Sequence, residues 1–457
     1  MPDNFHVSCD GRSGCGRRDF IKTGVFGFLG MSFMQMLNTH LLAEGADASK
    51  CDSVILIWLP GGPSQIDTFD PKPGRPCNLF NAIPTSADGI QVTEHFPKLA
   101  QQMKHVSLIR SMYSKEFDHE RATHLMHTSY PMSGAIQNPG LGANVTFEKG
   151  KRKEGIPAYV CTFAGGRGNV AAATRKAAGA GFLDGKCAPF LVCNVQDPSG
   201  KLKLSKDVSD ARFKHRVDLM SKFNREFNAA SGIEAPDCSG AYDEAVQLLE
   251  HNAADAFDIA KEPEKFKQDY GNTEIGKGLL MARRLVEKGV RFVEVVYGEW
   301  DHHSFFPIKA GITDNCKDLD PAMAALIADL NASGLLKRTL IICTGEMGRT
   351  SKFEGSGDKV GRDHNGKAWS TLIGGGGVKP GIVVGSTDAD GSEVKDRPVS
   401  PGDLHATVYD LLGVSYKKEN TDAHGFPHRL VNKKSKKGLP DEPSDGTPNE
   451  PIKELIA

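Results

Sequence analysis

Three short clusters of acidic and histidine residues lie close behind apolar, β-rich runs of this chain. In an open α/β sheet, ligands bind in the crevice beyond the carboxyl ends of the strands, so clusters placed there can converge on one site. Carboxylate and imidazole groups in combination suit a divalent metal ion. The run 290–297 precedes Gly298–His303, the run 339–343 precedes Thr344–Arg349, and Gly361–His364 follows shortly afterwards.

Strand-like and helix-like segments alternate along much of the chain, which predicts a doubly wound, mostly parallel sheet with helices on both faces. We expect a single α/β domain over residues 49–431 and a mobile tail over 432–457, which is rich in Lys, Pro, Asp and Glu. The expected strands are 53–59, 106–110, 158–163, 190–193, 290–297, 339–343, 370–373 and 382–384, and the expected helices lie near 119–128, within 205–288, near 319–334 and at 403–412.

The composition excludes several classes of protein. The chain has 457 residues, 25% of them charged, and a net charge of -1. This balance gives no electrostatic argument for nucleic acid or anionic lipid as a partner. No apolar run in the predicted mature chain reaches membrane-spanning length. The ten cysteines form no C-x-x-C pair, which argues against a structural zinc cluster.

The first 48 residues have the anatomy of an export signal. Arg17 and Arg18 precede a short, Gly-rich apolar stretch, and the small residues Ala46 and Ala48 frame a cleavage pattern. The paired arginines, with Phe20 following, indicate the twin-arginine export machinery as a partner. We therefore expect a periplasmic or secreted protein, although an uncleaved anchor is an alternative.

The residues of the three clusters are the first candidates for metal ligands. After a strand, Asp301 and His303 point to the same side, whereas His302 points to the other. Glu346 lies between glycines that permit a tight turn, and Asp363 and His364 follow in a loop. Taken singly, each cluster also fits an ordinary helix cap, ion pair or solvated loop. Together they predict a shared metal site.

Four further residues are candidates for this site. Ser64 and Asp67 follow the first strand after Gly61–Gly62 and could face the same crevice. His119 stands at the start of a predicted helix, and Arg349 could hold an anionic oxygen by a forked contact. A simple turn at Gly61–Gly62 and an ion pair between Arg349 and Glu346 are the alternatives.

At these motifs the chain resembles the domain of unknown function 1501 family, an exported, sulfatase-like family. The resemblance covers nearly all of the expected mature chain. It depends on Leu59–Pro73, Trp300–Ser304, Gly345–Thr350, Gly361–His364, Gly385–Asp388 and Asp403–Thr407.

This resemblance implies an alkaline phosphatase or sulfatase-like fold with one or two divalent metals after the strands. It implies that Asp301 and His303 belong to one ligand set, that Glu346 stands where sulfatases place an Asp, and that His364 is a later ligand. The nucleophile position of sulfatases holds Phe117, so no formylglycine can form there. Catalysis would then use a water molecule activated by metal, or Ser64.

We therefore expect an exported metal-dependent hydrolase of sulfate or phosphate esters. Its metal would be zinc, calcium or manganese, and its substrate an anionic small molecule or polysaccharide ester. The alternative is a non-catalytic exported binding or accessory protein on the same scaffold. An oxidoreductase partner is a weaker hypothesis, because no haem or iron–sulfur spacing supports it. The candidate ligands are Asp67, Asp301, His303, Glu346, Asp363 and His364, and the candidate catalytic residues are Ser64, His119 and Arg349.

Overall fold

The structure described here is a computed structural model. It describes residues 49–134, 136–165, 168–196, 198, 204, 207–231, 246–249, 253–303, 308–357, 359–422, 424–433 and 449–457. The predicted twin-arginine signal lies outside these described residues. The described residues from Lys50 onward form one compact unit. Among the described helices, none has both the length and the apolarity needed to cross a bilayer.

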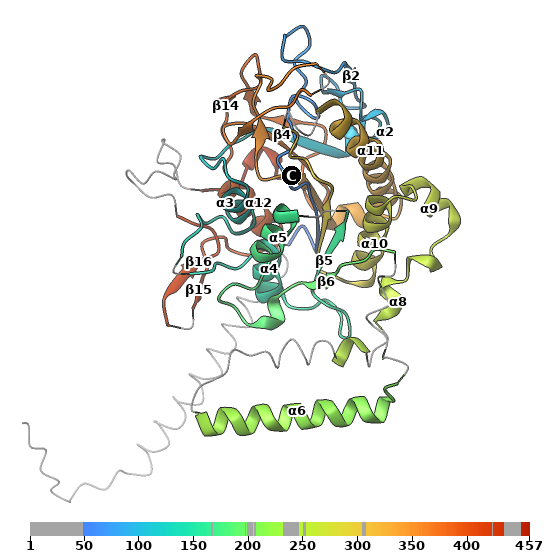
Figure 1. Ribbon diagram of the computed structural model, residues 1–457, viewed down its shortest axis with the longest axis vertical. Coiled ribbons are helices and arrows are strands. Elements are labelled where there is room, and N and C mark those ends of the chain that lie inside the picture. Colours follow the sequence, from blue (N-terminus) through green and yellow to red (C-terminus); the bar gives the residue numbers. More distant parts are fainter. Residues whose placement is uncertain are drawn as a thin grey trace, which may run out of the picture. The chain divides into compact units, whose positions relative to one another are not determined.

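An eight-stranded sheet runs through the centre of this unit (Figure 1). All neighbouring strands are parallel except where β11 pairs with β4 and β8 in the antiparallel direction. The strand order is β12 (Val383–Val384), β4 (Val106–Met112), β11 (Trp369–Gly374), β8 (Thr339–Thr344), β1 (Ser53–Trp58), β7 (Phe292–Tyr297), β5 (Tyr159–Ala164) and β6 (Phe190–Val192).

Strand β1 lies between β7 and β8, and this placement sets the position of the site. Trp58 is level with Val296 of β7 and with Thr344 of β8, so the three parallel strands end at the same edge. The loops that follow these strands therefore leave the sheet side by side. All residues of the three strands are buried, because helices cover both faces of the sheet.

The apolar core forms two layers, one on each face of the sheet. Helices α2, α10 and α11 contribute to one layer, and α3, α4, α5 and α12 contribute to the other (Figure 1). The helices are α2 (Pro97–Ala100), α3 (His119–Thr128), α4 (Leu141–Lys149), α5 (Gly168–Ala177), α6 (Asp210–Ser231), α8 (Ala254–Phe257), α9 (Glu264–Tyr270), α10 (Glu274–Lys288), α11 (Ile308–Ala332) and α12 (Pro401–Leu411).

Short two-stranded ribbons complete the fold. The most important one for the site pairs β9 with β10, and its register sets His364 opposite Arg349. The ribbons are formed by β2 (Ala82–Pro84) with β3 (Gln91–Thr93), β9 (Gly348–Arg349) with β10 (His364–Asn365), β13 (Ser386–Thr387) with β14 (Val394–Asp396), and β15 (Glu419–Thr421) with β16 (Pro427–Arg429).

The predicted fold class, a doubly wound and mostly parallel sheet with helices on both faces, is confirmed. The end of the chain differs from the prediction. The expected mobile tail does not hold for residues 449–457, because Ile452 and Leu455 are fully buried in the core beside α12. In addition, the Ile452 N–H donates to Thr407 of α12, and Arg397 forms an ion pair with Glu454.

Buried histidines make the stability of this fold sensitive to acid. His405 of α12 is buried, and its Nε2 lies 2.8 Å from the Met126 carbonyl of α3. Burial lowers the pKa of His405 to about 4. Its stabilising contribution is therefore present above the unfolded pKa of about 6.5 and is lost as the pH falls towards 4.

We expect metal-free protein to lose up to about 3 kcal/mol of unfolding free energy from His405 between pH 7 and pH 4. Urea unfolding at several pH values measures this loss. The control is His405→Gln, whose amide can still donate to the Met126 carbonyl but does not titrate. An equally steep acid loss in that variant would assign the effect to other groups.

Candidate metal site

Backbone hydrogen bonds join the loops that follow β1, β7 and β8. The Trp300 N–H donates to the Pro60 carbonyl at 2.9 Å, and the Arg362 N–H donates to the His302 carbonyl at the same distance. The β9–β10 ribbon then places His364 beside these loops. Four segments that are far apart in the sequence thereby share one edge of the sheet, as the three clusters predicted.

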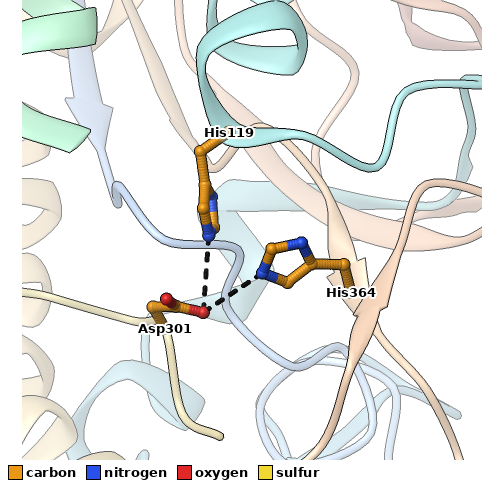
Figure 2. Close-up of side chains that lie close together, drawn as sticks. All are labelled: His119, Asp301 and His364. Carbon is orange, nitrogen blue, oxygen red and sulfur yellow. Dashed lines mark hydrogen bonds and ion pairs between the residues drawn. The ribbon is translucent and has the colours of Figure 1, made fainter. Parts of the chain in front are cut away.

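A fifth segment, the start of α3, closes the site. Asp118 caps this helix, because its carboxylate accepts the Arg121 N–H at 3.1 Å. His119 is the first helical residue, and it points at Asp301 (Figure 2). The predicted helix near 119–128 thus begins at the residue that reaches the site.

Three imidazole rings surround a single carboxylate oxygen, Oδ1 of Asp301. The Nε2 atoms of His303, His364 and His119 lie 3.0, 3.3 and 3.4 Å from it. Figure 2 shows His119 and His364 reaching this oxygen from different elements. His303 Nε2 also lies 3.0 Å from His364 Nε2. The four side chains are only 15–23% exposed.

The Nδ1 atom of each ring is bound to an oxygen. His119 Nδ1 lies 2.7 Å from Glu346 Oε1, and His364 Nδ1 lies 2.6 Å from the Phe117 carbonyl. His303 Nδ1 lies 3.2 Å from Glu354 Oε2. A carbonyl or an ionised carboxylate can only accept, so each Nδ1 carries the hydrogen. In a neutral ring, Nε2 then presents its lone pair to the centre of the cluster.

Lone pairs directed at one another and at a carboxylate oxygen repel unless a cation lies between them. Two ring nitrogens at 3.0 Å cannot both be acceptors without a shared positive charge. Ligand atoms about 2.0–2.1 Å from a zinc ion in tetrahedral geometry are roughly 3.3 Å apart. The distances around Asp301, from 3.0 to 3.4 Å, are of this size. The donor set therefore fits a bound metal ion.

Without a metal, protons can supply part of this positive charge. Burial opposes the charged form of His119, but the hydrogen bonds and charges of Asp301 and Glu346 outweigh it and raise the pKa of His119 to about 9. Burial would also raise the pKa of Asp301, yet His119, His364 and Arg349 together hold it well below its usual range. The arrangement thus favours positive charge at its centre.

Arg349 occupies a different position from the one predicted. It is fully buried, and its guanidinium donates to the carbonyls of Gly61, Gly62 and Arg362. It also donates to Asp301 and lies 3.2 Å from His303 Nε2. These contacts use all five N–H groups of the side chain. Arg349 therefore fixes the loops around Asp301 and has no N–H group left for an anionic substrate.

Ser64 and Asp67 belong to a separate buried group. Arg362 forms a forked ion pair with Asp67, at 2.7 and 3.1 Å, and the Ser64 hydroxyl donates to the same carboxylate. All three residues are almost completely buried. This arrangement replaces the predicted roles of Asp67 as a ligand and Ser64 as a nucleophile, because the Asp67 charge is already neutralised and the Ser64 hydroxyl is enclosed.

Two groups of ligand-type atoms meet the distance requirement for a metal among the described residues. One comprises His119, Asp301 and His364, and the other comprises His303, Asp363 and His364, with atoms within 4.8 Å of one another. The first is the better candidate. Asp363 is exposed, and its Oδ1 already accepts the His364 N–H at 2.8 Å.

Several residues of the site could not be found from sequence patterns. Glu354 and the Phe117 carbonyl orient His303 and His364, and Gly61 donates its N–H to Glu346 at 2.8 Å. For Gly61 the sequence did give a partial indication, because a Gly–Gly pair after a strand suggests that another segment approaches the backbone closely. Glu354 had no such indication, because a charged residue in a polar loop is usually solvated.

Gly61 has no room for a side chain. Its φ is +106°, and a Cβ there would lie 2.5 Å from the Asp301 backbone nitrogen. We expect Gly61→Ala to lower stability by about 1–3 kcal/mol and to displace Asp301, because the backbone must shift to relieve both the strain and the clash. Thermal unfolding and zinc titration measure the two effects.

Gly89→Ala is the matched control for this substitution. Gly89 has a φ of +73°, and a Cβ added there would meet no neighbouring described atom within 4 Å. Gly89→Ala therefore measures the effect of backbone strain alone, without a steric clash. Equal loss of metal binding in both variants would contradict the proposed close approach.

The fold and the site together define a class: a doubly wound α/β protein with a histidine-rich candidate metal site at the carboxyl edge of its sheet. The chain belongs to the family described as "Protein of unknown function (DUF1501)", whose model matches residues 51–438. No curated protein sequence is significantly similar to this chain.

Solved structures show distant similarity. The lipoteichoic acid synthase LtaP from Listeria monocytogenes is 11% identical, with 81% of this chain and 73% of that chain covered and a TM-score of 0.37. The alkaline phosphatase of the Antarctic bacterium TAB5 is 13% identical, with coverages of 74% and 95% and a TM-score of 0.35. The PsFucS1 sulfatase from Pseudoalteromonas sp. is 13% identical, with coverages of 83% and 71% and a TM-score of 0.37. Similarity at this level carries no argument about the chemistry of this chain.

Proposed function

We propose that this protein is an exported, metal-dependent hydrolase of sulfate or phosphate esters. One observation carries the proposal: three imidazole rings, each with Nδ1 bound to an oxygen, direct Nε2 at the same oxygen of Asp301. Histidine ligands of metals characteristically donate their other ring nitrogen to an oxygen in this way.

The composition of the site favours zinc or a similar transition metal over calcium. His119, Asp301 and His364 would hold the ion, which leaves a coordination position for a ligand from solution. Calcium takes six to eight oxygen ligands, whereas this group offers two nitrogens for each carboxylate. Glu346 Oε2 is buried and has no hydrogen-bond donor among the described residues, so this carboxylate adds negative charge beside the site.

When bound, the metal would act as a Lewis acid that polarises the ester and lowers the pKa of water. The chain's own residues would handle the proton. His303 Nε2 is unprotonated in this arrangement, because it accepts an N–H of Arg349; a proton from water would replace that hydrogen bond, and Glu354 would stabilise the charged ring through Nδ1. Water adds to sulfur or phosphorus, the bond to the alcohol oxygen breaks, and His303 transfers the proton from water to that oxygen.

Export and substrate class are also part of the proposal. The paired arginines at positions 17 and 18 support export to the periplasm or beyond. The substrate would be an anionic small molecule or polysaccharide ester, which the cationic site attracts. Ester hydrolysis by this site requires no serine nucleophile, in agreement with the enclosed position of Ser64.

The test begins with full-length protein purified without chelator. Bound metal is measured by elemental analysis, and turnover is measured on p-nitrophenyl sulfate, p-nitrophenyl phosphate and bis(p-nitrophenyl) phosphate. We expect zinc-dependent turnover that falls at least about 100-fold in His303→Asn, because general acid–base catalysis contributes about 10²–10⁴-fold. The exposed His215 supplies the control His215→Asn.

The outcomes separate the two functional classes. Zinc binding without turnover on any ester would support the non-catalytic binding or accessory protein. Absence of zinc, manganese and calcium binding would overturn the metal site itself. Turnover that is unchanged in His303→Asn would remove His303 from the proton transfer but leave hydrolysis intact.

A further inference from the structure

Glu346 is in contact with the site but does not belong to either group of ligand-type atoms. Its Oε1 accepts the Gly61 N–H at 2.8 Å and the His119 Nδ1–H at 2.7 Å. The side chain is fully buried. Neither group of described residues that meets the distance requirement for a metal includes it, whereas His119 belongs to the group with Asp301 and His364.

We propose that Glu346 is a positioning residue that orients His119 towards the ion, and that it is not itself a ligand. This inference rests on the proposed metal site. It reverses the roles that the sequence indicated for these two residues, because His119 becomes a ligand and Glu346 its hydrogen-bond acceptor.

The geometry explains why a carboxylate is placed here. His119 is the first residue of α3. Among the described residues, the carboxylates of Asp301 and Glu346 contact its two ring nitrogens, and without them the ring could rotate. Accepting the Nδ1–H holds the ring in one tautomer with Nε2 directed inward. Gly61 fixes the accepting oxygen in turn, so the position of His119 is set by the loop after β1.

Substitutions distinguish a positioning role from ligation. Glutamine keeps a carbonyl oxygen that can accept from both Gly61 and His119, whereas alanine removes the acceptor. We expect Glu346→Gln to bind zinc within a few-fold of the wild-type affinity. We expect Glu346→Ala to bind one zinc ion per chain about 10–100-fold more weakly, as is typical when the partner of a ligating histidine is lost. His119→Ala should lose more affinity than either.

Two controls accompany these variants. Glu299 is an exposed acidic residue two positions from Asp301, and it does not bond to His119. Glu299→Gln therefore tests whether removal of a nearby negative charge alone weakens zinc binding. The visible spectrum of cobalt-loaded protein is the second readout, since a change in the orientation of His119 alters the ligand field while a loss of general stability does not.

The expected result is a cobalt spectrum that changes in Glu346→Ala and returns to the wild-type form in Glu346→Gln, with Glu299→Gln unchanged. Loss of zinc in Glu346→Gln as severe as in His119→Ala would show that Glu346 is a ligand and overturn the inference. Wild-type affinity in Glu346→Ala would overturn it as well. If the alanine variant does not fold, Glu346→Gln decides alone. Failure of the wild-type protein to bind metal would instead remove the proposed function, and this inference with it.

Discussion

Replacing Asp301 by asparagine is expected to abolish stoichiometric metal binding. Oδ1 of Asp301 is the atom on which three imidazole nitrogens and Arg349 converge. Asparagine keeps the size and can still accept from Arg349, so the loops should remain in place. It removes the negative charge that offsets the cost of holding a divalent ion beside Arg349. The loss should exceed the roughly 100-fold expected for an orienting residue, and isothermal titration with zinc measures it.

Asp363→Asn is the matched control, since Asp363 lies beside His364 but is exposed. We expect its zinc affinity to remain close to that of the wild type. If Asp363→Asn lost as much affinity as Asp301→Asn, the ion would have to be assigned to the group of His303, Asp363 and His364.

Replacing Glu294 by alanine is expected to reduce the unfolding free energy by about 3–5 kcal/mol, the usual cost of breaking a buried ion pair. Glu294 lies in β7 and is fully buried, and its carboxylate is 2.9 Å from His127 Nε2 of α3. Tyr159 of β5 donates its hydroxyl to the same carboxylate. Alanine would leave both partners without an acceptor inside the core. Urea unfolding at pH 6 measures the loss.

Glu120→Ala gives a comparison on α3, the helix that carries His127. Glu120 pairs with Lys176 at 3.0 Å, but both side chains are more than half exposed. Solvent screens such a pair, so we expect a loss of less than about 1 kcal/mol. Comparable losses for Glu294→Ala and Glu120→Ala would contradict the buried ion pair.

The contribution of the Glu294–His127 pair has a defined dependence on pH. Burial opposes the charged form of His127, but the charge and hydrogen bond of Glu294 outweigh it and raise its pKa. A raised histidine pKa gives stability that is fully present below the unfolded value of about 6.5 and is lost as the pH rises through the folded value. The difference between wild type and Glu294→Ala should therefore shrink at alkaline pH.

The sheet could be predicted from the sequence because burial on both faces leaves a local pattern. Strands β1 and β8 are continuous apolar runs, and Asp118 marks the start of α3. The antiparallel direction of β11 could not be predicted, because an apolar run looks the same in either direction. The docking of residues 449–457 was missed for a related reason. The two buried residues that anchor this segment, Ile452 and Leu455, stand in a polar sequence whose partner helix lies elsewhere in the chain.

The clustering of Asp301, His303 and His364 could be anticipated, because strand ends in one sheet share an edge. The partners of the individual side chains could not. The acceptor of His119 is 227 positions away, and Arg362, the cation that neutralises Asp67, is 295 positions from it. Asp67 and Asp301 both follow buried strands and look equivalent in the sequence, so only the folded chain shows which one already has a cation of its own.

The anchoring of Arg349 has a consequence for how an ion would enter. Its guanidinium is held by three main-chain carbonyls from two loops, independently of any metal. We therefore expect the walls of the cluster to be rigid before an ion is bound, so that little chain entropy is lost on uptake. Apoprotein and holoprotein should have nearly the same shape, and a chelator should remove the ion without unfolding the sheet.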